Sequence, residues 1–205
     1  MKKSVVILSI IVAVLTVAAV GLFVLAVPLW DALPPNHIRV VQPRQDPNHL
    51  DLLLTMQGQA DFNFRAQGGE DGFVHIMMHL AYFQKDELIL RETVMGMGIG
   101  VGDGPVDVSG SILWGIATPQ AGVQELRARV IVNGASSQGN FDLSRLDFQP
   151  MAIMGPNFTN EQIVPGQRYV VQMQNTSGRV TMHDQFDPEI LRDSEHTVIL
   201  YIIFE

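Results

Sequence analysis

Histidine and methionine residues on both sides of a predicted hairpin turn could bind a metal ion. His75 and Met77 come before the turn, which we expect at residues 85–87, and Met95 and Met97 come after it. Pairing around that turn sets Met77 opposite Met95. His75 then faces Met97, so all four side chains share one face. Thioether and imidazole ligands suit Cu(I), and the pattern predicts a candidate copper site.

The same residues have a simpler interpretation, which the sequence leaves open. Methionine is an adaptable filler of hydrophobic cores, and a slip of one residue in the pairing would separate the four side chains. His75 and His79 have a spacing that would place both imidazoles on one face of a helix. On a strand they lie about 13 Å apart. We expect a strand, because "QKDE" resembles a turn and "LILRETV" a returning strand, so these two histidines alone should not hold an ion.

Glycine occupies every second position of "MGMGIGVGDG". On a strand this spacing leaves one face bare at Gly96, Gly98, Gly100 and Gly102. The stretch fits neither a dinucleotide-binding loop nor a P-loop, because no lysine or helix follows it, and two nearby aspartates are too few for calcium. A bare face lets another backbone or an aromatic ring approach closely. Internal packing or a bend of the sheet is the first explanation, and contact with a partner chain is the second.

A third group of polar residues lies in "HDQFDPEILRDSEH", residues 183–196. Two histidines and several carboxylates could form a zinc or calcium site or a general acid and base pair. Charged residues around a loop and a short helix are also typical of a solvated surface. No nucleophile elbow, H-E-x-x-H or S-x-x-K motif lies nearby. We therefore expect no enzyme activity, and no cofactor apart from the copper alternative.

The elements that carry these residues alternate between apolar and polar side chains with a period of two, which indicates strands with one buried and one wet face. The apolar positions are Leu50, Leu52, Leu54 and Met56, then Ala60, Phe62, Phe64 and Ala66, then Leu126, Ala128, Val130 and Val132, and finally Tyr169, Val171 and Met173. Trp114 alternates with two isoleucines and is expected in the core.

Two further segments complete the predicted fold. "DPEILRD" from Asp187 predicts one short helix with an Asp cap and Pro188 in its first turn, and His196–Phe204 is apolar on both faces, as in a strand covered on both sides. Turn signals separate eight to ten short strands. The sequence predicts an all-β fold, an antiparallel two-sheet sandwich of immunoglobulin-like type with one short helix, preceded by a single N-terminal transmembrane helix.

The N-terminal segment predicts attachment to a membrane. Lys2 and Lys3 precede an uncharged apolar run over residues 4–30, which is longer than a secretory signal and long enough to span a bilayer. We expect an uncleaved signal anchor in residues 1–30, with a long cleaved signal as the alternative. The lysines indicate a cytoplasmic N-terminus. Residues 31–49 are predicted to be a Pro-rich linker and residues 50–205 an extracytoplasmic domain, either periplasmic or on the cell surface.

Composition excludes several classes of function. The chain has no cysteine, which rules out disulfides and thiolate chemistry. Its formal net charge is −8, and two of its 13 basic residues are Lys2 and Lys3, so nucleic acid is a poor partner. The leading hypothesis is a membrane-anchored extracytoplasmic interaction or accessory protein that docks on an envelope protein or membrane complex. The alternative is the Cu(I)-binding module described above.

Overall fold

The structure is a computed structural model of the chain. It describes residues 33–42, 56–66, 73–100, 105–117, 124–146, 148, 150, 152–178 and 186–205. The chain divides into two compact units, Met1–Pro34 and Pro35–Glu205, and nearly all described residues belong to the second. The predicted anchor over residues 4–30 lies outside the described residues. Among the residues that are described, no helix is both long and apolar enough to cross a membrane.

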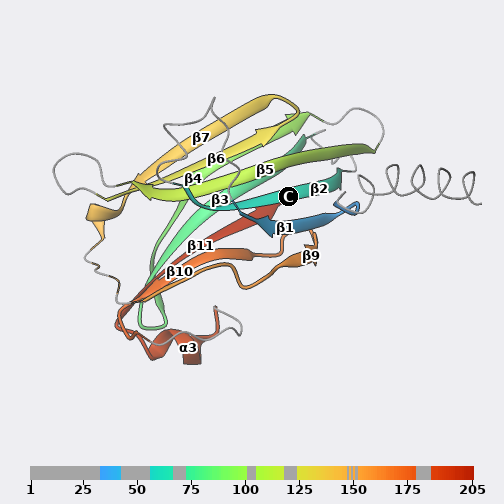
Figure 1. Ribbon diagram of the computed structural model, residues 1–205. Helices are drawn as coiled ribbons and strands as arrows, with labels where there is room; N and C mark the ends of the chain where they lie inside the picture. Colours follow the sequence, from blue (N-terminus) through green and yellow to red (C-terminus); the bar gives the residue numbers. More distant parts are fainter. Residues whose placement is uncertain are drawn as a thin grey trace, which may run out of the picture. The chain divides into compact units, whose positions relative to one another are not determined.

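The described residues form two antiparallel sheets (Figure 1). Sheet A has six strands in the order β7-β6-β5-β2-β1-β9, and sheet B has five in the order β4-β3-β11-β10-β8. The strands are β1 (His37–Val41), β2 (Met56–Ala66), β3 (Phe73–Gln84), β4 (Glu87–Gly100), β5 (Val106–Ala117), β6 (Glu125–Val132), β7 (Ala135–Asp142), β8 (Ala152–Met154), β9 (Asn160–Gln162), β10 (Tyr169–Asn175) and β11 (His196–Phe204). The predicted all-β class with two antiparallel sheets is confirmed. The immunoglobulin-like type is not confirmed.

The core lies between the two sheets and follows the predicted alternation. The inner faces of β2 and β6 bury the expected residues, namely Ala60, Phe62, Phe64, Ala66, Leu126, Ala128, Val130 and Val132. Trp114 on β5 is also buried, and its ring fills the space beside Gly58. A Cβ at Gly58 would lie 2.1 Å from Cζ2 of that ring, so only glycine leaves room for the indole.

The predicted linker over residues 31–49 is wrong for one segment. His37–Val41 forms β1, which pairs with β2 and β9. Ile38 is fully buried in the core. The prolines that flank the segment at Pro35 and Pro43 suggested an extended spacer, but an extended backbone is also what a strand requires. Tertiary pairing therefore decides the conformation here.

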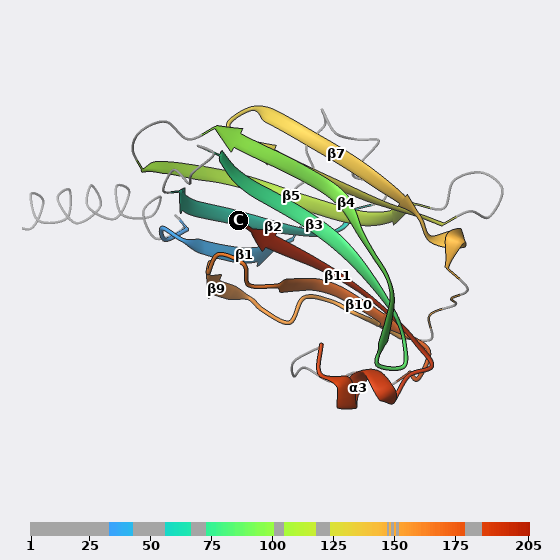
Figure 2. The same ribbon diagram turned by 180° about the vertical axis from the view of Figure 1, so that it is seen from behind.

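The outer face of sheet B is partly covered by the predicted short helix, α3 (Pro188–Arg192), which is confirmed together with its Asp187 cap. The helix lies beside the hairpin end of β3 and β4 (Figure 2). Arg192 Nη2 is 2.7 Å from Asp86 Oδ2 in the hairpin turn. A second apolar cluster forms under the helix from Ala81, Phe83, Met154, Val170, Met173, Leu191, Ile199, Tyr201 and Ile203. Strand β11 is therefore covered on both faces, as predicted.

Strand β10 departs from the predicted alternation. A bulge lies between Val170 and Gln172. Because the bulge adds one residue, it reverses the faces of the residues that follow. Gln172 and Gln174, expected to be wet, are buried and point between the sheets, whereas Met173 belongs to the outer cluster.

The two sheets meet along one edge, where β4 of sheet B lies beside β7 of sheet A (Figure 2). Ser137 Oγ donates a hydrogen bond to the carbonyl oxygen of Gly96 at 2.9 Å. A Cβ at Gly139 would lie 1.8 Å from the carbonyl oxygen of Val94. The backbones therefore approach at a distance that only glycine permits.

Candidate interaction surface

The glycine row of β4 faces solvent and not the core. Gly96, Gly98 and Gly100 are exposed, whereas the residues between them, Met97 and Ile99, pack against the core. Gly102 lies outside the described residues. On the neighbouring strand β3, Met77 is paired with Gly96 and His75 with Gly98. The outer face of sheet B is consequently bare along this part of its edge strand.

The predicted copper cluster is not assembled. Met95 pairs with Met78 and Met97 with Ile76, so both methionines face the core while His75 and Met77 lie on the outer face. The expected register was wrong by one residue at these positions. The hairpin has two bulges, between Tyr82 and Phe83 and between Met78 and His79, and the second is the cause, because the first offsets a turn that is one residue shorter than expected. Each bulge shifts the pairing by one residue and exchanges the faces that follow it.

The other predicted ligand groups are also separated. His75 and His79 both lie on strand β3, as predicted, and there His75 is exposed whereas His79 is buried. In the third group, Asp187 caps α3, Glu195 lies 3.9 Å from Lys85, and His196 Nδ1 is 2.7 Å from the hydroxyl of Tyr82. His183 and Asp184 of this group lie outside the described residues. Within the described part of the chain, no three His, Asp or Glu side chains gather as a metal site would require.

Sequence analysis missed a cluster of aromatic and cationic side chains around Tyr201 on the outer face of sheet B. The guanidinium carbons of Arg91 and Arg168 lie 6.0 and 5.8 Å from the centroid of the Tyr201 ring. His79 contributes a ring 5.4 Å from the same centroid, and Phe186 packs edge-on at 5.2 Å. Both arginines are exposed, and the tyrosine beneath them is buried. We call these five residues the Tyr201 cluster.

The electrostatics of this cluster differ from those around four other arginines. Arg65, Arg127, Arg145 and Arg192 each form an ion pair with a carboxylate. Among the described residues, Arg91 and Arg168 form no such pair and instead lie over an aromatic ring, an arrangement that is favourable because the ring face is electron-rich. The cluster is therefore a local concentration of positive charge on an acidic protein.

His79 sits at the base of the cluster with one unsatisfied ring nitrogen. Its Nδ1 is 3.1 Å from the hydroxyl of Thr93, and its Nε2 is buried without a hydrogen-bond partner among the described residues. Burial lowers the pKa of His79 below its ordinary value of 6.5, and Arg91 and Arg168 lower the pKa further, whereas Glu205 raises it. The electrostatic environment thus favours the neutral imidazole.

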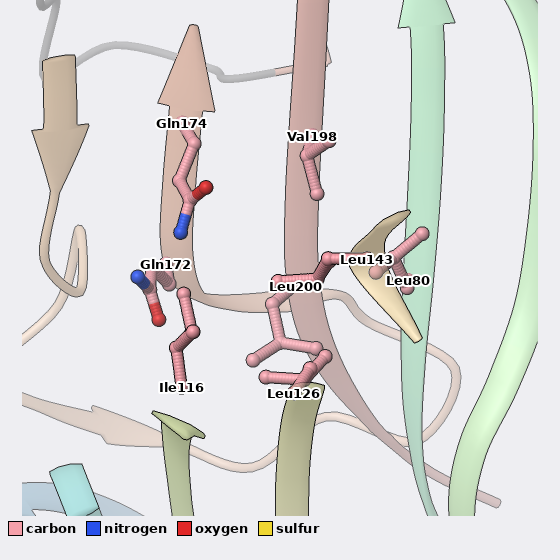
Figure 3. A pocket seen from close by; sticks show the side chains of 8 residues that line it. All are labelled: Leu80, Ile116, Leu126, Leu143, Gln172, Gln174, Val198 and Leu200. Atoms are coloured by element: carbon pink, nitrogen blue, oxygen red, sulfur yellow. The ribbon is translucent and has the colours of Figure 1, made fainter. Parts of the chain in front are cut away.

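A small cavity lies between the sheets and holds no candidate ligand site (Figure 3). Gln172 and Gln174 reach it from β10, and the rest of its wall is apolar. Its volume is about 10 Å³. This is the lower limit for one water molecule, so an organic ligand does not fit.

Comparison with known proteins does not assign a function. The chain matches no family model, and no curated protein or solved structure is significantly similar to it. A function for this chain therefore has to follow from its own residues.

Proposed function

We propose that the folded part of this chain is a protein-interaction module that docks on another protein through the outer face of sheet B. Residues 4–30 anchor it in a membrane with the folded part outside the cytoplasm, so that it serves as an accessory protein on an envelope protein or membrane complex. This proposal assigns binding and no catalysis. An immunoglobulin-like connectivity stays a prediction on which the proposal does not depend.

The exposed glycine at position 96 carries the proposal. Glycine in a strand costs about 0.5–1 kcal/mol of stability relative to alanine. At Gly58 and Gly139 the fold requires it, because an added Cβ would collide with neighbouring atoms. At Gly96 an added Cβ would meet only Met77 Cγ, at an ordinary contact distance of 3.8 Å. The described part of this chain gives no internal reason for glycine there, and close approach by a partner supplies an external one.

The outer face of sheet A carries polar side chains that bind one another. Asp61 accepts hydrogen bonds from Gln59 Nε2 at 2.8 Å and from Ser111 Oγ at 2.7 Å. Glu125 accepts one from Arg127 Nε at 2.9 Å. Two of these bonds run along one strand, and the bond from Ser111 to Asp61 joins neighbouring strands.

The outer face of sheet B has the opposite character. It combines the bare glycine row with the Tyr201 cluster, in which two exposed arginines lie on an aromatic ring. Interface centres are enriched in tyrosine, phenylalanine and arginine relative to the rest of a protein surface. This difference between the two outer faces favours docking on sheet B.

The sheet edges are less suitable for a partner. The edge of β4 is approached by β7, as described above. Strand β8 is bounded by Pro150 and Pro156, and β9 is followed closely by Pro165. Both strands have only three residues. Short edge strands flanked by proline resist addition of another strand.

The proposal is tested by extracting the full-length protein from its native membrane in mild detergent and measuring its native mass. We expect a stoichiometric complex with a second chain. Gly96→Ala should weaken that complex about tenfold or more, because one extra methyl group in a close contact costs about 1–3 kcal/mol. The matched control is Gly155→Ala, at an exposed glycine where an added Cβ meets nothing within 4 Å. A lone monomer in the native extract would overturn the proposal.

A further inference from the structure

We propose that the Tyr201 cluster is an oxyanion-binding site that takes carboxylate side chains from an acidic, extended segment of the docked partner. This inference rests on the proposed function and names the chemistry of the partner.

The arginines are placed to receive carboxylates. When a guanidinium lies over an aromatic ring, its N–H groups point outward in the plane of the guanidinium. There they can bind a carboxylate in a bidentate manner. Arg91 reaches Tyr201 from β4, and Arg168 reaches it from the residue before β10. Packing on the ring orients both groups before a ligand arrives, which reduces the entropy lost on binding.

The histidine gives an independent indication of a missing acceptor. His79 is only 6% exposed, and its Nε2 has no hydrogen-bond partner among the described residues. When the hydroxyl of Thr93 donates to Nδ1, the neutral ring carries its hydrogen on Nε2. A buried donor without an acceptor costs about 1–3 kcal/mol. A ligand carboxylate that reaches this nitrogen would supply an acceptor.

Charge favours an acidic occupant over a basic one at this site. The chain as a whole carries a formal net charge of −8, yet two arginines without carboxylate partners among the described residues meet here. Glu205 also acts on His79, and its effect on the pKa is smaller than that of Arg91 and larger than that of Arg168. An acidic segment therefore gains attraction at the cluster, whereas the net charge of the whole chain repels it.

The geometry also accommodates an extended segment with acidic residues at alternate positions. Both guanidiniums lie near one ring, so their separation is at most the sum of their distances from its centroid. Alternate residues of an extended chain are about 6.7 Å apart and point to the same side. Two such carboxylates can reach the two arginines together. The same segment can continue over the flat glycine row of β4.

The test uses the full-length protein in detergent and two peptides, acetyl-Glu-Ala-Glu-Ala-Glu-amide and its glutamine counterpart, with inorganic phosphate as a third probe. The side-chain NMR signals of His79 report binding and its pKa. We expect saturable binding of the glutamate peptide only. Binding should raise the pKa of His79, because a nearby carboxylate stabilises the imidazolium and offsets Arg91 and Arg168.

Arg91→Gln and Arg168→Gln should each weaken binding of the glutamate peptide about tenfold. Each should also reduce the change in the pKa of His79 that the peptide causes. Both positions are exposed, so the fold should survive, which the melting temperature checks. Arg168→Lys keeps the charge but loses the planar guanidinium. Its affinity for the glutamate peptide should lie between those of the parent and Arg168→Gln. Arg65→Gln is the matched control, because it removes the same charge from a side chain paired with Asp107 on sheet A.

Three results would overturn the inference: no saturable binding, an equal loss in Arg65→Gln, or binding of phosphate in preference to the peptide. The native complex separates this inference from the proposed function. If the partner still co-purifies with Arg91→Gln and Arg168→Gln but is lost with Gly96→Ala, docking on sheet B stands and the acidic-segment site fails.

Discussion

Replacing glycine by alanine in two adjacent strands should change stability in opposite directions. The two positions are Gly96 on β4 and Gly139 on β7, at the edge where the sheets meet. In Gly139→Ala the new Cβ would lie 1.8 Å from the carbonyl oxygen of Val94 and 2.9 Å from its carbonyl carbon. In Gly96→Ala the new Cβ lies in ordinary contact with Met77. Comparison of the two variants therefore distinguishes a glycine that packing requires, Gly139, from one that packing does not require, Gly96.

The magnitudes follow from these contacts. The clash at Gly139 is with backbone, which cannot rotate away, so we expect a loss near the upper end of the overpacking range, about 3 kcal/mol. Gly96→Ala restricts the unfolded chain and should stabilise the protein by about 0.4–1 kcal/mol. For a domain of this size, 1 kcal/mol moves the melting temperature by about 2–4 °C. Gly139→Ala should melt about 6–12 °C lower than the parent, and Gly96→Ala about 1–4 °C higher.

The assay is thermal unfolding of the full-length protein in detergent, followed by the fluorescence of buried Trp114 in a Trp30→Phe background. Gly155→Ala reports the effect of an added methyl group in open space. A loss of more than about 1 kcal/mol in the free energy of unfolding of Gly96→Ala would refute this prediction, because the fold itself would then require glycine at that position. Glycine at position 96 would then no longer point to a docked partner.

Three further predictions concern buried groups. Gly58→Ala should displace the Trp114 ring, which the new Cβ would overlap at 2.1 Å, and shift its emission to longer wavelength; an unchanged spectrum contradicts this. Tyr169→Phe keeps the ring but loses the hydroxyl that donates to Gln162 O at 2.8 Å and accepts from Val164 N at 2.7 Å. We expect a loss of about 1–2 kcal/mol in urea unfolding, and no loss would mean that water replaces both bonds. Because the folded pKa of His79 is lowered, chiefly by burial, the unfolded chain binds a proton first as the pH falls. The stability that is present above about pH 6.5 should therefore decline as the pH falls through the folded pKa. The free energy of unfolding should fall less steeply with pH in His79→Gln, and equal slopes in the parent and the variant would count against this assignment.

Local patterns were sufficient to predict much of the fold. Period-two alternation identified the inner faces of β2 and β6, and continuous apolar character identified β11. The Asp187 cap and Pro188 predicted α3. These features depend on residues close together in the chain, where side-chain direction alternates regularly. The segment His37–Val41 was missed because its pairing partners lie far away in the sequence.

The candidate site could not be predicted, because it depends on register and strand order. The turn of the β3–β4 hairpin is one residue shorter than expected, with Gln84 paired to Glu87. The first bulge restores the expected register, so that His79 pairs with Thr93, and the second bulge removes it again before Met95. The shared face that the copper hypothesis required is lost at that second bulge. No residue type in this stretch signals such an insertion, since the extra residue, Val94, is itself a good strand former.

The Tyr201 cluster shows the same dependence on nonlocal pairing more strongly. Arg91, Arg168 and Phe186 approach one ring from three separate parts of the chain, and they do so because sheet B has the order β4-β3-β11-β10. In the sequence, each arginine looks like an ordinary charged residue on a wet strand face. Only the position of β11 between β3 and β10 places Tyr201 beneath both charges. Two arginines that have no carboxylate partner among the described residues gather on an aromatic ring, next to backbone left bare by glycine, and this combination is why we propose a partner for this face.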